Sequence, residues 1–374
     1  MSQTYRLAII GFAHMHINNV ASLFADHPQV EWVGCADTVP ALPELRAAPY
    51  TRDWNRAHLM DKLSIPRCYD DYHELLAETS PDIVIVTTEN VQHPAVVEAC
   101  AAAGANVCVE KPMSMSLSHA LCMHRACHAA GTKLVVNWPL TWSPAARTAK
   151  ALVDEGKIGR VIEVKWRTGH NGPLGSGAKH AGVDDVAAPM NGTELASTWW
   201  HQEAAGGGAM LDFCCYGALA ARWFTDQQAV AALGMKANLN SQWSDANDNG
   251  AILVRFPAAM ALIEGTWTTL DHGGPTSIVY GTTGTLSLTR GRDGQLVRIG
   301  RGGGESEIVQ PEPLPKGRTT IAEEYIHHLE TGEPLHPTLE AGLNLEVAAI
   351  LDAGLRSAAS GALETVDNAT WCIG

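Results

Sequence analysis

The sequence predicts an α/β protein with an N-terminal Rossmann domain on a doubly wound parallel sheet and a C-terminal α/β domain with a large, mostly antiparallel open sheet. Three observations predict this. The chain has 374 residues, long for one ordinary core. In the first part, short β-branched apolar runs alternate with amphipathic stretches, as in a parallel sheet covered by helices. Later strand-like runs follow one another with few helices between them, so we place the domains at 1–140 and 141–374.

The first half supplies alternating strands and helices. Runs rich in Val and Ile predict strands at Leu7–Ile10, Val30–Cys35, Ile83–Thr87, Ala105–Val109 and Lys133–Val136. Apolar residues at helical spacing predict helices at His16–Asp26, Pro94–Ala103 and Leu117–Ala130. Because strand–helix–strand units wind right-handed, this order should form a Rossmann-type sheet.

The second half shows the sequence pattern of an antiparallel sheet. It predicts strands at Arg160–Thr168, Ala229–Asn238, Ala251–Phe256, Ala261–Thr268, Ser277–Tyr280 and Thr285–Thr289. Helices are predicted at Ser143–Glu155, Thr320–Glu330 and Leu339–Ala359. The polar, Gly-rich stretch Gly172–Ser197 suits a loop over a binding site, and Arg301–Glu305 suits the end of a hairpin.

The composition favours a cytoplasmic protein that binds neither nucleic acid nor membrane. The formal net charge of -14 is spread along the chain, whereas nucleic acids and anionic membranes require basic patches. No apolar run reaches the roughly 18 residues of a spanning helix, and the start of the chain lacks a charged leader with a cleavage site. The 9 cysteines are irregularly spaced without a CxxC pair, as expected of free thiols in a reducing compartment.

A turn after the first predicted strand indicates a dinucleotide site. A pyrophosphate needs free backbone N–H groups and the positive end of a helix dipole, and Gly11 supplies the turn between strand and helix. The fingerprint Gly-x-Gly-x-x-Gly here reads Gly11-Phe12-Ala13-His14-Met15-His16. Ala13 still allows close approach, whereas His16 is uncommon at the helix-packing position. We expect this loop to hold the cofactor; an ordinary strand-to-helix turn is the alternative.

Asp37 follows the second predicted strand, where a carboxylate can accept hydrogen bonds from the adenine ribose hydroxyls. A carboxylate repels a 2′-phosphate, and Thr38 occupies the place where a phosphate-binding arginine would help. We therefore expect NAD, with NADP as the less favoured cofactor. A solvated turn aspartate is the alternative interpretation.

Four motifs resemble those of the glucose–fructose oxidoreductase / inositol dehydrogenase (Gfo/Idh/MocA) family. They are Thr87-Thr88-Glu89-Asn90 with His93, Glu110-Lys111-Pro112, Asn137-Trp138-Pro139 and Gly206-Gly207-Gly208-Ala209-Met210-Leu211-Asp212. The resemblance covers nearly the whole chain, and the Glu-Lys-Pro triplet is its most specific part. It implies a Rossmann domain, a second domain whose open sheet often mediates dimers or tetramers, and sugar, inositol or polyol substrates. We accordingly expect a homodimer or homotetramer.

The resemblance also implies catalytic roles. Lys111 matches a lysine that contacts both substrate and nicotinamide, and its ammonium would stabilise negative charge on the reacting oxygen. Asp212 matches an aspartate that lines the substrate site. The family's usual histidine base is replaced by Tyr216. Because a nearby ammonium favours the phenolate, we expect Tyr216 and Lys111 to form an acid–base pair. Alternatively Tyr216 only packs, and Asp212 or a histidine is the base.

Further residues complete the expected site. His170 follows a strand that should border the substrate, and His180 and His201 flank the long loop, so these are rival bases, although histidines in such places are more often solvated or packed. Indole rings pack on sugar faces, which favours substrate contacts for some of the tryptophans Trp138, Trp142, Trp199 and Trp200; core packing is the alternative.

The expected catalytic residues are Lys111, Tyr216 and Asp212. The expected substrate-binding residues are Lys111, Trp138, His170, Trp200, Asp212 and Tyr216. The expected cofactor-binding residues are Gly11, Phe12, Ala13, His14, Asp37, Thr87, Thr88, Asn90, His93, Glu110 and Lys111.

These features predict hydride transfer between a nicotinamide cofactor and a hydroxyl or carbonyl carbon of a sugar, inositol or related polyol. Two alternatives remain: an NAD-dependent glycosidase that oxidises its sugar transiently, and a non-catalytic protein that senses a dinucleotide or a sugar. No metal is expected. His14-x-His16 and the cluster Cys122, His124, Cys127 and His128 contain ligand types but lack structural-zinc spacing.

Overall fold

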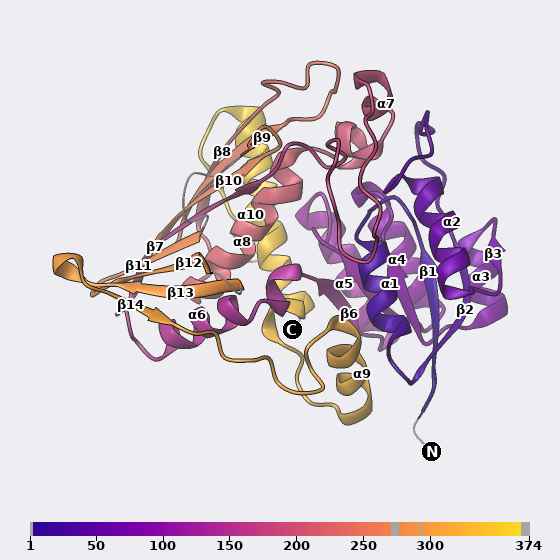
Figure 1. Ribbon diagram of the computed structural model, residues 1–374, viewed down its shortest axis with the longest axis horizontal. Coiled ribbons are helices and arrows are strands. Elements are labelled where there is room, and N and C mark those ends of the chain that lie inside the picture. The colour runs from indigo at the N-terminus through magenta and orange to yellow at the C-terminus, as the bar shows by residue number, and fades with distance from the viewer. Residues whose placement is uncertain (1–2, 271–276, 292–293, 368–374) are drawn as a thin grey trace.

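Six parallel strands form the first sheet of the computed structural model, which describes residues 3–270, 277–291 and 294–367 (Figure 1). The strands are β1 (Tyr5–Ile10), β2 (Val30–Ala36), β3 (Cys68–Tyr69), β4 (Ile83–Val86), β5 (Asn106–Glu110) and β6 (Leu134–Asn137). Their order is β3-β2-β1-β4-β5-β6, so the chain winds outward from β1 in both directions. The predicted Rossmann sheet is confirmed.

Five helices connect these strands. They are α1 (Ile17–Ala25), α2 (Arg52–Leu63), α3 (Tyr72–Thr79), α4 (His93–Ala102) and α5 (Leu117–Ala130). The sequence predicted α1, α4 and α5 but not α2 or α3. The buried positions of α2 are Arg52, Asn55 and Leu59, so this helix turns a mostly polar face inward and lacks the apolar stripe that marks an amphipathic helix.

Nine strands form the second sheet, in the order β14-β13-β12-β11-β7-β10-β9-β8-β15. They are β7 (Val161–Gly169), β8 (Ala231–Ala237), β9 (Asn249–Arg255), β10 (Met260–Thr266), β11 (Ser277–Gly281), β12 (Thr285–Gly291), β13 (Gly294–Gly300), β14 (Ser306–Val309) and β15 (Glu364–Thr365). Among the described pairs, only β7 and β10 run parallel, so the predicted antiparallel character is confirmed. The sequence did not predict β13 and β14, whose hairpin end contains the Gly-rich turn Gly302–Gly304.

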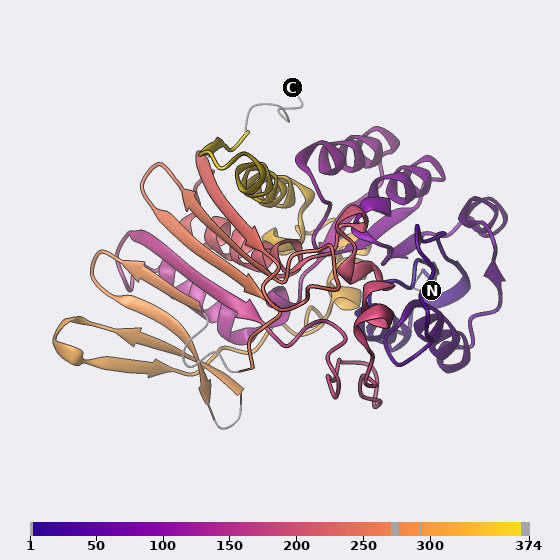
Figure 2. The same ribbon diagram turned by 90° about the horizontal axis from the view of Figure 1, so that it is seen from above.

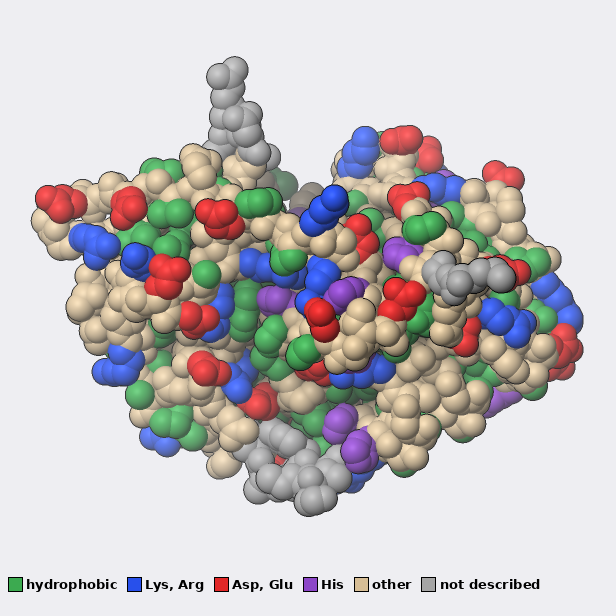
Figure 3. All heavy atoms as spheres, turned by 90° about the horizontal axis from the view of Figure 1, so that it is seen from below, with side chains coloured by type: hydrophobic (Ala, Val, Ile, Leu, Met, Phe, Trp, Pro, Cys, Tyr) green, Lys and Arg blue, Asp and Glu red, His purple; other side chains and the backbone are tan. Residues whose placement is uncertain are grey.

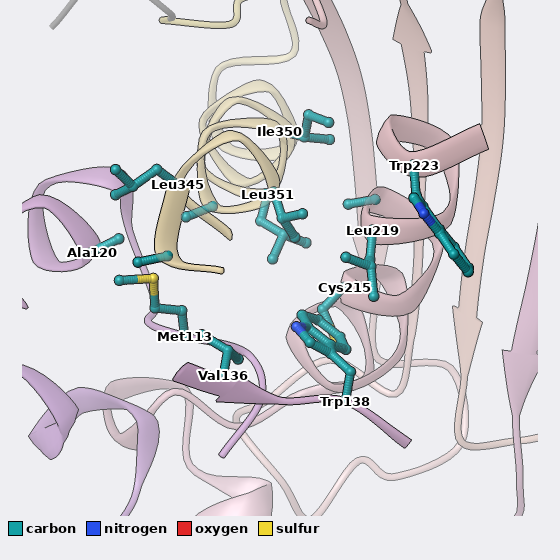
Figure 4. Close-up of a cluster of buried hydrophobic side chains, with 14 of the residues drawn as sticks. Met113, Ala120, Val136, Trp138, Cys215, Leu219, Trp223, Leu345, Ile350 and Leu351 are labelled. Carbon is teal, nitrogen blue, oxygen red and sulfur yellow. The ribbon is translucent and has the colours of Figure 1, made fainter. Parts of the chain in front are cut away.

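Three helices, α6 (Pro144–Asp154), α8 (Ala209–Thr225) and α10 (Ala341–Ser360), cover one face of this sheet (Figure 2). A Cβ on Gly217 would lie 2.3 Å from Ile263 Cγ2, so α8 packs very closely on β10. The segment Glu203–Thr225 is long and apolar enough to cross a membrane. However, 83% of its most apolar 18-residue stretch is buried inside the structure, as expected of a core helix. Figure 4 shows side chains of β6, α8 and α10 meeting in one core that joins the two sheets.

The last part of the chain returns to the first sheet. Helix α9 (Ile321–Thr331) belongs to the predicted second domain, yet the Tyr325 hydroxyl donates to the Lys133 carbonyl beside β6 at 2.8 Å. The boundary at residue 140 stays a prediction.

The remaining helices are short: η1 (Asn90–Gln92), η2 (Pro139–Trp142), α7 (Gly192–Ala196), η3 (Trp199–His201), η4 (Glu203–Ala205), η5 (Gly302–Gly304) and η6 (Pro337–Leu339). Acidic and basic side chains are interspersed over the face in Figure 3, in keeping with charge spread along the sequence.

Candidate active site

The dinucleotide loop joins β1 to α1 and lies against the segment that follows β4. Gly11 has a φ of 96°, and a Cβ there would lie 2.4 Å from Thr88 Cγ2, so glycine is required for this approach. Thr87 Oγ1 donates to the Gly11 carbonyl at 2.7 Å, and the His14 amide donates to the Thr87 carbonyl at 3.1 Å. These four predicted cofactor residues therefore meet at the carboxyl ends of β1 and β4, where sheets of this topology bind dinucleotides.

Asp37 lies at the end of β2 beside this loop, as predicted. Its Oδ1 accepts hydrogen bonds from the backbone amides of Phe12 at 3.3 Å and Thr38 at 2.8 Å. Its Oδ2 is buried without a hydrogen-bond partner among the described residues, next to a cavity of about 300 Å³. Because buried polar atoms are normally satisfied, this oxygen and this cavity fit an adenosine ribose that donates its hydroxyls.

An arginine that the sequence did not predict also lies beside Asp37. The guanidinium of Arg52, at the start of α2, forms ion pairs with both Asp37 and Glu89. Thr38 itself carries no charge, as predicted, but the positive charge comes from another element. Local spacing gives no signal for it because α2 begins 15 residues after Asp37 along the chain.

The Glu110-Lys111-Pro112 triplet leaves the carboxyl end of β5, with a cis peptide between Lys111 and Pro112. Lys111 Nζ lies 2.7 Å from Asp212 Oδ1, and Asp212 is on the first turn of α8. Trp267, which follows β10, donates its indole N–H to Asp212 Oδ2 at 3.0 Å. The fold therefore brings the predicted Lys111 and Asp212 together, and a third residue holds the second carboxylate oxygen.

The Lys111–Asp212 pair is charged despite its burial. Burial opposes ionisation of the aspartate, but the Lys111 ammonium, His170 and the hydrogen bonds from Lys111 and Trp267 together lower the pKa of Asp212. Burial likewise opposes the ammonium, but Asp212 and the neighbouring Tyr216, Cys215 and Glu110 together raise the pKa of Lys111 well above its ordinary value. A desolvated ammonium held in this way is a strong hydrogen-bond donor to an oxygen that develops negative charge.

Tyr216 lies beside this pair, and burial works against its expected role in an acid–base pair with Lys111. Burial raises the pKa of Tyr216 well above its ordinary value, and Lys111 offsets only part of that effect. Lys111 Nζ lies over the ring, 5.0 Å from its centroid, and its charge is already paired with Asp212. The tyrosine is therefore poorly suited to accept a proton near neutral pH.

Trp138 is a core residue, which corrects its expected contact with substrate. Its side chain is fully buried, and its indole N–H donates to Asn344 Oδ1 on α10 at 2.7 Å. Figure 4 shows its ring beside Cys215 of α8. Because the only donor of the ring is already used inside the core, Trp138 has none to offer a substrate hydroxyl.

Other predicted residues line a small hollow around the pair. Trp200 and Asn90 share this hollow with Lys111, Asp212 and His14. Asn90 Nδ2 donates to the carbonyl of Gly206 at 2.8 Å. The hollow therefore joins the dinucleotide loop, the triplet and the Gly-rich start of α8.

The predicted His170 and His93 do not line the hollow, but each is close to residues of the site. The ring of His170, just after β7, packs edge-on against Phe213 at 4.9 Å between centroids, and in its protonated form it lowers the pKa of Asp212. His93 is fully buried, and its Nδ1 bonds the Met113 carbonyl at 3.1 Å. His93 thus supports the backbone just after the triplet.

The long segment between β7 and α8 contacts both the dinucleotide loop and α2. The Trp199 indole donates to the Ala13 carbonyl at 2.8 Å, and Lys62 Nζ donates to the Gly182 carbonyl at 2.8 Å. Phe12, by contrast, is fully buried in the core beneath. The segment therefore touches the dinucleotide loop through Trp199 and the last turn of α2 through Gly182.

Contacts that the sequence did not predict include Arg52, Trp267 and a pair formed by His16 and Glu110. His16 Nδ1 lies 3.0 Å from Glu110 Oε1. Each of the three contacts joins elements far apart along the chain. A tryptophan directly after a strand is a usable signal for Trp267, since strand ends border such sites.

Fold and site together define an oxidoreductase of the Rossmann class that binds a nicotinamide dinucleotide and carries a second, sheet-based domain. Residues 5–138 match the oxidoreductase family with an NAD-binding Rossmann fold, and residues 146–287 match the GFO/IDH/MocA C-terminal domain. The chain belongs to the Gfo/Idh/MocA family of NAD(P)-binding oxidoreductases.

Similar proteins include dehydrogenases of sugars. The chain is 27% identical to a D-xylose 1-dehydrogenase [NADP(+)] of Haloarcula marismortui, over 50% of this chain and 48% of that protein, so the match spans about half of that relative. It is 26% identical to D-xylose 1-dehydrogenase (NADP(+)) 2 of Haloferax volcanii, over 90% and 97%. The structure of aldose–aldose oxidoreductase from Caulobacter crescentus, complexed with glycerol, superposes with a TM-score of 0.75 at 21% identity, covering 97% of this chain and 100% of that chain. That likeness shows the shared fold.

Proposed function

We propose that the chain transfers a hydride between a nicotinamide dinucleotide and a hydroxyl or carbonyl carbon of a sugar, an inositol or a related polyol. The observation that carries this proposal is the buried Lys111–Asp212 pair, held 2.7 Å apart beside the dinucleotide loop. A bound nicotinamide supplies the hydride acceptor or donor. Lys111 donates a hydrogen bond to the substrate oxygen, and Asp212 fixes the ammonium in place.

His170 is the side chain we propose to exchange the hydroxyl proton. It directly follows β7 and is near enough to Asp212 for a protonated imidazole to interact with the carboxylate. Imidazole groups titrate near neutrality, which suits a general base. Tyr216, with its raised pKa, does not meet this requirement.

The test is a screen of sugars, inositols and sugar acids with NAD⁺ and NADP⁺, with reduced nicotinamide followed by absorbance. Net accumulation of reduced cofactor with any of them, lost in Lys111→Ala, supports the proposal. Turnover without net reduced cofactor would support the glycosidase alternative. Dinucleotide binding without any turnover would support the sensor alternative.

We propose NAD as the preferred cofactor. A 2′-phosphate would meet the Asp37 carboxylate, and the Arg52 guanidinium that could offset this repulsion is already paired with Asp37 and Glu89. The unpartnered Oδ2 of Asp37 suits a ribose hydroxyl better than a phosphate. The two xylose dehydrogenases above are named for NADP, so dissociation constants for both dinucleotides decide this point.

We propose a homodimer or homotetramer that assembles through the second sheet, on the face opposite α8 and α10. Leu233, Leu253 and Leu262 are cross-strand neighbours on β8, β9 and β10, and all three are exposed. Met235, on the same face, is 74% exposed. A contiguous exposed apolar row of this kind marks an interaction surface. Light scattering should show an oligomer that Leu253→Lys dissociates, whereas Leu363→Lys, at another exposed leucine, leaves it intact.

We also propose that the protein is cytoplasmic. All cysteines among the described residues are free thiols, including the adjacent, buried Cys214 and Cys215. Free thiols are typical of a reducing compartment. Subcellular fractionation with an antibody tests this, and recovery outside the cytoplasmic fraction would contradict it.

A further inference from the structure

His14 carries a side-chain nitrogen that is buried without a partner. Its Nδ1 accepts a hydrogen bond from the His16 backbone amide at 3.2 Å. Since a backbone amide can only donate, Nδ1 must be the unprotonated nitrogen, and the ring proton sits on Nε2. That Nε2 has no hydrogen-bond partner among the described residues, and His14 is only 2% exposed. The hollow therefore contains one unsatisfied hydrogen-bond donor.

Asn90 supplies the complementary group. Its Nδ2 donates to the Gly206 carbonyl at 2.8 Å, which fixes the orientation of the side-chain amide. Its Oδ1 is then the free acceptor, and this atom is also buried without a partner in the described part of the chain. His14 and Asn90 line the same hollow as Lys111 and Asp212. Two buried unsatisfied polar atoms in one hollow are unusual, because leaving such an atom without a partner destabilises the fold unless a ligand satisfies it.

We propose that His14 and Asn90 recognise one ligand group that accepts a hydrogen bond from His14 Nε2 and donates one to Asn90 Oδ1. Two sources offer this chemistry beside Lys111: the carboxamide of the nicotinamide, and a pair of neighbouring hydroxyls on the substrate. The inference rests on the proposed function, since both sources belong to that reaction. It assigns His14 a role through its side chain, beyond its place in the cofactor loop.

The surroundings of His14 keep it a donor. Burial lowers the pKa of His14 well below its usual value, and the neighbouring His16 and Lys111 lower it further, so the ring stays neutral. A neutral ring with a fixed tautomer donates from Nε2 at all working pH values. The rings of Trp200 and Trp199 pack on His14, with centroids at 4.6 and 5.8 Å.

A metal ion is a competing explanation for the unpartnered nitrogen of His14, because ligand atoms of His14, His16 and Glu110 lie within 4.8 Å of one another. The hydrogen bonds do not favour it. His14 Nδ1 already accepts from the His16 amide, and His16 Nδ1 bonds Glu110 Oε1 at 3.0 Å. A metal on either ring nitrogen of neutral His14 would remove the hydrogen bond from the His16 amide, because Nδ1 would then be occupied or protonated.

The test uses the full-length protein, without cofactor, and its own tryptophan fluorescence. The protein is titrated separately with NAD⁺ and with its 3-acetylpyridine analogue, which keeps the carbonyl but lacks the amide N–H. If the ligand group is the carboxamide, the wild type should bind NAD⁺ about 10-fold more tightly than the analogue, the effect of one buried hydrogen bond. Asn90→Ala should abolish this difference, and His14→Phe should weaken both dinucleotides.

If the ligand group is the hydroxyl pair of the substrate, dinucleotide affinities should not change in these variants. The KM for a substrate found in the screen should instead rise about 10-fold or more in His14→Phe. His14→Gln, whose amide can donate, should restore part of the loss in either case. His336→Phe, which removes a half-buried imidazole next to Trp223 and away from the hollow, is the matched control.

Thermal unfolding of each variant separates loss of folding from loss of recognition. The inference is overturned if folded His14→Phe and Asn90→Ala both bind dinucleotides and substrate like the wild type. It is also overturned if purified wild type carries one tightly bound metal ion that His14→Phe loses. Failure of the wild type to bind any dinucleotide would instead contradict the proposed function.

Discussion

The indole N–H of Trp267 donates to Asp212 Oδ2 at 3.0 Å, while Lys111 holds the other oxygen of the same carboxylate at 2.7 Å. The two bonds come from opposite sides, one from the end of β10 and one from the end of β5. The Asp212 carboxylate is therefore fixed between the two domains. Its position determines where the Lys111 ammonium points.

Trp267→Phe removes the indole donor and keeps an aromatic ring. We expect a loss of about 1–3 kcal/mol in the free energy of unfolding, because a buried carboxylate oxygen loses its partner. We also expect kcat to fall about 10-fold while the dissociation constant of the cofactor stays the same. Urea unfolding and steady-state kinetics measure these effects. A variant with wild-type kcat would show that Trp267 has only a packing role.

Tyr216→Phe and His170→Asn test which side chain moves the proton. Because burial raises the pKa of Tyr216, we expect Tyr216→Phe to retain turnover within about 10-fold. His170→Asn should lower kcat by about 100-fold or more, the usual contribution of a general base. The pH profile of kcat for His170→Asn should also lose its acidic limb. The opposite pattern would return the role of base to the tyrosine.

Asp37→Asn tests the cofactor pocket. The neutral amide leaves Arg52 in an ion pair with Glu89 alone and replaces one of the two acceptor oxygens by an NH2 group, which can only donate. We expect the affinity for NAD⁺ to fall about 10-fold and the preference over NADP⁺ to shrink, since the repulsion of a 2′-phosphate is removed. Asp53→Asn, on the rim of the same cavity, is the control. An unchanged ratio of the two dissociation constants would contradict the assignment of Asp37.

His201 makes the fold sensitive to acid. Burial lowers the pKa of His201 to about 3, although Asp248 opposes this shift. An unfolded chain protonates the same histidine near pH 6.5, so the unfolded state binds more protons below that pH, and stability falls as the pH falls from about 6.5 towards 3. Between about pH 7 and pH 5 this amounts to about 2 kcal/mol.

His201→Phe should therefore lose less stability over this pH interval than the wild type. Urea unfolding at both pH values measures the difference. The control is His327→Phe, at an exposed histidine paired with Glu333. Equal slopes for His201→Phe and the wild type would mean that His201 is not the group responsible.

The sequence predicted the sheets better than their connections. Strand positions followed from β-branched runs such as Ile83–Val86, whose side chains are all buried, so that the chemical pattern matches the packing. Helix α2 has no such pattern, because its buried face holds Arg52 and Asn55, which serve the cofactor region. Polar side chains that are buried for function look like surface residues in a sequence.

The site was predictable where motifs carry it and not where side chains from distant elements meet. Lys111 and Asp212 were found from their motifs, although 101 residues separate them. The directions of side chains were not predictable: Trp138 turns into the core to meet Asn344, and Lys111 faces the ring of Tyr216 and not its hydroxyl. These directions depend on α8 and α10, which no local spacing reveals.

The most direct test removes the hydrogen bond that Lys111 is proposed to donate to the reacting oxygen. Lys111→Met would leave Asp212 buried without its partner, so it is made together with Asp212→Asn, which avoids an unpaired buried charge. The double variant should bind dinucleotide within a few-fold of the wild type, by tryptophan fluorescence, and lose about 1000-fold or more in kcat for nicotinamide-linked oxidation. Wild-type turnover in this folded double variant would contradict the account.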